Sequence, residues 1–72
     1  MRYYLEYEGD LALLSQIQKA IALLRQRGRI KEYDWVEIEW GYRRDGIWVR
    51  IWCDTPWLCK IIQDCVELGY CE

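Results

Sequence analysis

The sequence predicts one small α+β domain that covers residues 1–72 in the order strand, helix, strand, strand, helix. Three observations predict it: some segments carry apolar residues at helical spacing, others alternate apolar and polar residues, and an Asp-Gly pair separates the last two alternating segments. A chain of 72 residues has room for one hydrophobic core. These elements fit two layers, with both helices on one face of a three-stranded sheet.

The first strand is expected over residues 2–8, where Tyr3, Leu5 and Tyr7 point to one face and the residues between them to the other. Gly9 ends this strand, and the side chain of Asp10 is expected to cap the first helix. The helix should end at Gly28 and bury a stripe of apolar side chains: Leu14, Ile17, Ala20, Ile21 and Leu24.

The next two strands are expected to form a hairpin. Asp45-Gly46 lies between them and favours a type I′ turn, which places Arg44 opposite Ile47. The expected pairs on the helix-facing side are Tyr42 with Val49, Trp40 with Ile51 and Ile38 with Cys53. On the other side the expected pairs are Arg43 with Trp48, Gly41 with Arg50 and Glu39 with Trp52. A slip of one residue would mix apolar and polar residues on both faces.

The second helix is expected to begin at Asp54-Thr55-Pro56, an N-cap residue followed by proline in the first turn. Its expected buried stripe is Leu58, Ile61, Ile62, Cys65 and Leu68, and Gly69 ends it. Residues 47–53 are richest in β-branched and aromatic residues, so they should form the central strand of a sheet ordered 1-3-2. The layout resembles a ferredoxin-like split β-α-β unit without its last strand, and this topological resemblance carries no functional residues.

Composition argues against several classes of function. The net charge of −2 argues against nucleic-acid binding, which needs a clustered basic surface. Histidine is absent, which removes the commonest general base and metal ligand. We therefore expect no enzyme, no cofactor and no metal site. No apolar segment is long enough to span a membrane and no signal peptide is recognised, so we expect a soluble protein without membrane association, cytoplasmic if natural.

The cysteines lie at a constant spacing of six, which matches neither a zinc motif nor a redox motif: Cys53, Cys59, Cys65 and Cys71. In a straight helix Cys59 and Cys65 are too far apart to bridge. Two local disulfides are feasible, Cys53 with Cys59 and Cys65 with Cys71. The alternative is that Cys53 and Cys65 are small buried apolar residues with free thiols.

The sheet face opposite the helices gathers the residues that we expect to form an interface: Tyr4, Trp35, Arg43, Trp48, Arg50 and Trp52. Exposed aromatic residues in such number are typical of binding hot spots. One interpretation is a protein interface, most simply a homodimer that buries this face. The other is cross-strand packing that only covers the sheet. Base stacking on RNA is disfavoured because acidic residues share the face.

The leading functional hypothesis is a small scaffold without catalytic activity. Short connections, caps and a matching apolar pattern agree with one another, as in a designed sequence, although four cysteines and exposed tryptophans argue against design. A small natural protein, for example from a thermophile or a virus, is the other source of such a scaffold. The alternative function is a protein-binding or inhibitor module that uses the aromatic sheet face.

Overall fold

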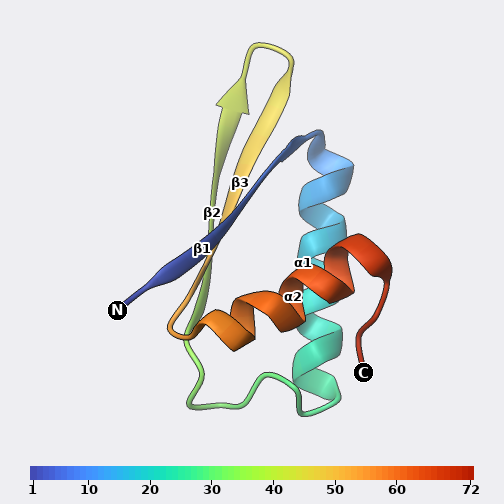
Figure 1. Cartoon of the computed structure of the whole chain (residues 1–72). Coiled ribbons are helices and arrows are strands. Elements are labelled where there is room, and N and C mark those ends of the chain that lie inside the picture. Colours follow the sequence, from blue (N-terminus) through green and yellow to red (C-terminus); the bar gives the residue numbers. More distant parts are fainter.

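The structure is a computed structural model that describes residues 1–72. Its elements follow the expected order, with β1 at Tyr3–Gly9, α1 at Leu11–Gln26, β2 at Val36–Arg43, β3 at Gly46–Cys53 and α2 at Pro56–Leu68. The strands form an antiparallel sheet in the order β1-β3-β2. Both helices lie on one side of this sheet (Figure 1). The expected fold class, strand order and layers are therefore confirmed.

Helix α1 has the expected cap and buried stripe. The Asp10 carboxylate accepts a hydrogen bond from the backbone N–H of Leu13 at 3.2 Å, as an N-cap residue should. The buried residues of α1 are those of the expected stripe: Leu14, Ile17, Ala20, Ile21 and Leu24. They pack in one core with the central strand and α2, where Ile51 and Ile62 are fully buried.

Helix α2 begins as expected but turns a different side toward the core. Thr55 is its N-cap, and Pro56 occupies the first turn. Leu58, Ile62 and Cys65 are buried as expected, together with Cys59 and Val66. The expectation was wrong for Leu68, which is 75% exposed, while Ile61 is only partly buried. Two adjacent rows of side chains on α2 are apolar. Packing against α1 selects the row that contains Val66. The backbone carbonyl of Val66 accepts a hydrogen bond from the side chain of Gln16 in α1.

The hairpin register differs from the expected one by two residues. Arg43 pairs with Gly46, so Arg44 and Asp45 form the two-residue loop. Neither loop residue has a positive φ, which a type I′ turn requires, so the expected Asp45-Gly46 turn was wrong. Gly46 instead begins β3, where a side chain would collide with the carbonyl oxygen of Gly9 at the end of β1.

The shift changes every expected partner but no face. On the helix side, Tyr42 pairs with Ile47, Trp40 with Val49 and Ile38 with Ile51. On the opposite side, Gly41 pairs with Trp48, Glu39 with Arg50 and Glu37 with Trp52. Successive side chains of a strand point to opposite faces, so a shift of two residues keeps each of them on its expected face.

The layers do not cover each other completely. Both α1 and α2 pack against β3, and α2 also packs against β1, whereas neither helix contacts β2 to a comparable extent. The tip of the β2–β3 hairpin projects beyond the first turn of α1 (Figure 1). Neither helix has the length and apolar character needed to cross a membrane. The helix-facing side of β2 is thus the least protected apolar part of the sheet.

Candidate functional site

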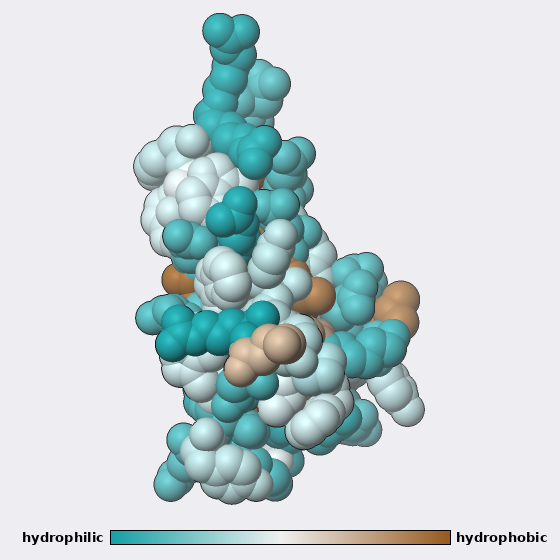
Figure 2. Space-filling view, turned by 60° about the vertical axis from the view of Figure 1, so that its left-hand side comes forward, coloured by the Kyte–Doolittle hydropathy of each residue, from teal (hydrophilic) through white to brown (hydrophobic).

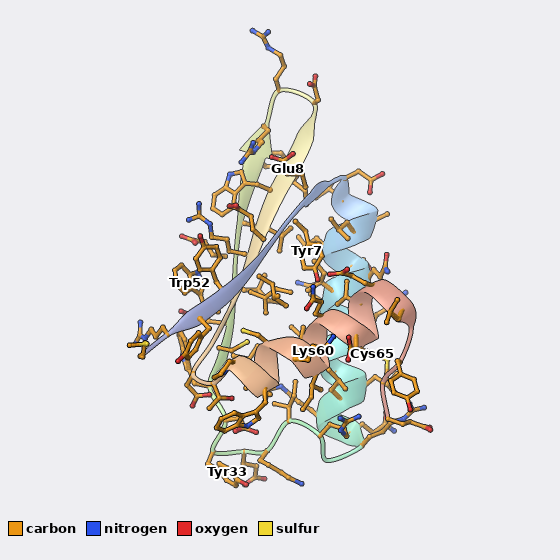
Figure 3. The ribbon with its side chains drawn as sticks, in the orientation of Figure 1. Tyr7, Glu8, Tyr33, Trp52, Lys60 and Cys65 are labelled. Atoms are coloured by element: carbon orange, nitrogen blue, oxygen red, sulfur yellow. A yellow bond between two sulfur atoms is a disulfide. The ribbon has the colours of Figure 1, made fainter.

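The structure gathers the six expected interface residues on the sheet side that faces away from the helices, which we call the outer sheet face. Figure 3 shows Trp52 projecting from this side, whereas Tyr7 points toward the helices. The residues come from all three strands and from the segment just before β2: Tyr4, Trp35, Arg43, Trp48, Arg50 and Trp52. The expected location of this group is correct. Whether these side chains are free to bind a partner depends on how they contact one another.

Arg50 lies at the centre of the outer sheet face, on the middle strand. Its Nε donates a hydrogen bond of 2.9 Å to the Glu6 carboxylate, and its Nη1 lies 3.8 Å from the Glu39 carboxylate. The guanidinium also lies 5.6 Å from the ring centre of Tyr4 and 5.3 Å from that of Trp48. The hydrogen bond to Glu6, more than any other contact, raises the pKa of Arg50. This arginine is therefore fully engaged within its own chain.

The other aromatic rings on this face also have partners within the chain. The rings of Tyr4 and Trp52 are 4.9 Å apart at an angle of 43°, and the indole N–H of Trp52 donates a hydrogen bond to Glu39 at 3.2 Å. The guanidinium of Arg2 lies 4.4 Å from the ring centre of Trp35. Of the aromatic residues on this face, Tyr4 is 52% exposed, and the three tryptophans are partly buried.

Trp48 occupies space that its cross-strand neighbour leaves empty. A Cβ atom at Gly41 would lie 2.8 Å from the indole nitrogen of Trp48 and 3.0 Å from two of its ring carbons. The indole therefore covers the backbone of Gly41, in the manner of an aromatic residue that shields a strand glycine. Beside it, Arg43 forms an ion pair of 2.6 Å with Glu8, across the sheet.

The contacts on the outer sheet face favour cross-strand packing, which was one of the two interpretations of this group. Figure 2, with this side of the molecule turned forward, shows hydrophilic residues mixed with residues of intermediate hydropathy and no continuous hydrophobic patch. A dimer through this face, with its arginines paired to the partner's carboxylates, would compete with ion pairs that already exist. That the outer sheet face is a protein interface stays a prediction.

A second surface lies on the opposite side of the hairpin, and pattern reasoning did not find it. We call it the open hairpin face; it consists of Leu11, Trp40 and Tyr42. Trp40 and Tyr42 are 40% and 74% exposed, and Leu11 at the start of α1 is 54% exposed. The rings of Trp40 and Tyr42 meet edge to face, with centres 5.3 Å apart. The expectation that Trp40 faces the helix side is correct, but the helices pack least against its strand, and Trp40 stays 40% exposed.

The open hairpin face adjoins a free sheet edge. In the order β1-β3-β2, β2 pairs with β3 on one side only, so its other side leaves backbone N–H and C=O groups without a strand partner. The strand is eight residues long, contains no proline and pairs regularly along its length. An edge of this kind, next to exposed aromatic side chains, can accept another strand.

The cysteines form one structural disulfide and one buried thiol pair. Cys65 and Cys71 are joined by a disulfide, one of the two expected local pairings. Cys53 and Cys59 are free and buried. Burial, followed by the neighbouring Cys59 thiol, raises the pKa of Cys53, so its reactive thiolate form is disfavoured at neutral pH. No group of three or more His, Cys, Asp or Glu side chains is placed to hold a metal ion.

No protein-family model matches the chain, and no curated protein or solved structure is significantly similar to it.

Proposed function

We propose that this chain is a non-catalytic protein-binding module that binds its partner through the open hairpin face and the adjacent edge of β2. One observation carries the proposal: the edge-to-face pair of Trp40 and Tyr42 is exposed beside a strand edge that has no partner. Unlike the rings of the outer sheet face, this pair has no arginine stacked on it, and it lies on the strand that the helices pack against least.

Strand addition explains how such a surface would bind. An extended segment placed beside β2 gains main-chain hydrogen bonds along the edge, and these supply affinity. Its alternate side chains would lie on the helix side, next to Trp40 and Tyr42, and these contacts supply specificity. Tryptophan and tyrosine are enriched among residues that dominate binding energy.

The absence of ordinary catalytic groups supports a non-catalytic role. The sequence contains no histidine. The buried cysteine of β3 has a raised pKa, and its neighbours are apolar residues of the core. Three carboxylates of the outer sheet face, those of Glu6, Glu8 and Glu39, are paired with arginines, an arrangement that does not suit a general acid or base.

Selection of extended peptides from a displayed random library, with the wild-type chain as bait, tests the proposal. We expect the selected peptides to bind Tyr42→Thr at least about tenfold more weakly than wild type in fluorescence polarisation, because a hot-spot aromatic is removed. Tyr33→Thr is the matched control, since Tyr33 is 83% exposed in the loop before β2 and lies at the opposite end of the molecule (Figure 3).

Two results would overturn the proposal. The first is a selection that yields no peptide with measurable affinity. The second is a set of peptides that bind Tyr42→Thr as tightly as wild type but lose affinity when Trp48 is replaced by threonine. That pattern would move the binding surface to the outer sheet face.

A scaffold without a partner is the second candidate function, and the outer sheet face favours it. Every arginine and tryptophan named on that face has a partner within the chain. A face that satisfies its own charges and covers its own backbone has a structural role whether or not a partner exists.

A further inference from the structure

We infer that the partner is a second copy of this chain, joined to the first by antiparallel pairing of β2 with β2, with Trp40 opposite Trp40 of the second copy. The inference rests on the proposed function and specifies the partner for the same surface. It would turn two three-stranded sheets into one six-stranded sheet with all four helices on one side.

Symmetry limits the registers that such a dimer can use. A two-fold axis perpendicular to the sheet makes the two β2 strands antiparallel and places paired side chains on the same face. Each residue then pairs with a residue an even number of positions away in the sequence, or with its own copy. The choice among these registers depends on the charged residues of β2.

Charge complementarity selects the register centred on Trp40. It places Glu37 opposite Arg43 of the second copy on one face, and Ile38 opposite Tyr42 on the other. A register centred on Glu39 would place that carboxylate opposite itself, and one centred on Ile38 would place Glu37 opposite Glu39. Like charges directly opposite each other are destabilising in antiparallel pairs.

The remaining attractive register is less favourable because of contacts within the chain. Centring on Gly41 places Glu39 opposite Arg43, but Glu39 already accepts a hydrogen bond from Trp52 and lies near Arg50. Glu37 has no ion pair and no side-chain hydrogen bond, and it is exposed. Both registers draw on Arg43, which already forms an ion pair with Glu8, so they differ in the carboxylate alone. The register centred on Trp40 uses the one carboxylate of β2 that has no partner.

The dimer would also cover the open hairpin face. Both helices pack over β1 and β3, so neither would obstruct the β2 strand of a second copy that lies beside β2 in the plane of the sheet. From the area of a fully covered Trp or Tyr, the exposed parts of Trp40 and Tyr42 amount to roughly 500 Å² for two copies. This area, added to a short strand pairing, is below that of an ordinary interface, so we expect a weak dimer in the micromolar range.

The other sheet edge offers no comparable surface. The helix-facing residues of β1 are partly buried, and the Tyr7 hydroxyl donates a hydrogen bond of 2.7 Å to Glu67 of α2. Because α2 packs against β1, an added strand there would find no exposed aromatic row. The free edge and the exposed aromatic pair coincide only at β2.

Sedimentation equilibrium with charge-reversal variants tests the inference. Glu37→Arg places two arginines opposite each other, and Arg43→Glu places two carboxylates opposite each other, so each variant alone should dimerise at least about tenfold more weakly than wild type. In a 1:1 mixture, a heterodimer pairs each new charge with its opposite, so the mixture should regain association. Glu32→Arg, the same charge change in an exposed loop, should associate like wild type.

Circular dichroism and thermal unfolding show whether each variant keeps its fold. Because Arg43→Glu also breaks the ion pair with Glu8, Glu37→Gln provides a test that leaves Arg43 unchanged and should weaken association less than Glu37→Arg.

A wild type that stays monomeric up to about 1 mM would overturn the inference. So would a mixture of the two variants that fails to regain association. Peptide binding by a monomeric wild type would show that the proposed function stands while the second copy is not the partner.

Discussion

Replacement of Gly46 by alanine tests the hairpin register most sharply. Gly46 begins β3 with φ at +154°, a conformation that residues with a side chain rarely adopt. A Cβ atom at this position would collide with the carbonyl oxygen of Gly9, and a backbone atom cannot rotate away as a side chain can. Gly46→Ala should therefore separate the hairpin from the end of β1.

The expected loss has two parts. The unfavourable φ costs about 1–3 kcal/mol for a residue other than glycine. Relief of the collision by a backbone shift costs about 1–3 kcal/mol more, as in other overpacked sites. We therefore expect Gly46→Ala to lower the free energy of unfolding by about 3 kcal/mol. Gly69→Ala is the control, because Gly69 has φ at +71° but no atom within 4 Å of the added Cβ, so it should cost only about 1 kcal/mol.

Urea unfolding followed by tryptophan fluorescence measures this difference. With a denaturant slope of about 1 kcal/mol/M for a small domain, the midpoints of the two variants should differ by about 2 M. Equal losses for Gly46→Ala and Gly69→Ala would refute the reasoning. They would mean that Gly46 is needed only for its dihedral angle, as in the turn that the sequence suggested.

Two further predictions concern α2. Burial, followed by the hydrogen bond to Glu67, raises the pKa of Tyr7 above its ordinary value of 10.0, so the folded state holds the phenolic proton more tightly than the unfolded chain. This contribution to stability is fully present below about pH 10 and decreases as the pH rises further, so Tyr7→Phe should flatten the alkaline fall of the unfolding midpoint; an unchanged fall would contradict it. Cys71→Ser removes the disulfide to Cys65 and should lower the free energy of unfolding by about 2 kcal/mol, given the short loop that it closes. Reductant should lower the stability of wild type by a similar amount and leave the variant unchanged, and a wild type insensitive to reductant would contradict this.

The β-branched and aromatic content of residues 47–53 predicts the sheet order. Alternation predicts the face of each strand residue, because burial on one side imposes a period of two. The same argument cannot distinguish registers that differ by two residues, since both keep Trp40 and Ile51 on the helix side. Turn chemistry favoured the wrong register because Asp45-Gly46 matches a type I′ turn locally. The glycine is required instead by a contact with Gly9, which lies in a strand distant in the sequence.

The candidate site was predictable in part for a related reason. Alternation shows that Trp48 and Trp52 lie on the outer sheet face, and it shows that Tyr42 lies on the helix side. It does not show how far the helix layer extends, so it could not indicate that Tyr42, on the helix-facing side, is 74% exposed. The contact between Arg50 and Glu39 on that outer face also depends on the final register, which brings the two residues opposite each other.

Dilution followed by NMR of the indole N–H resonances tests the central claim most directly, because each of the five tryptophans reports its own surroundings. Between about 1 mM and about 10 µM, the resonance of Trp40 should shift as the dimer dissociates, while those of Trp48 and Trp52 stay in place. A shift of Trp48 and Trp52 with Trp40 unchanged would place the contact on the outer sheet face, and the assignment of the open hairpin face would be wrong.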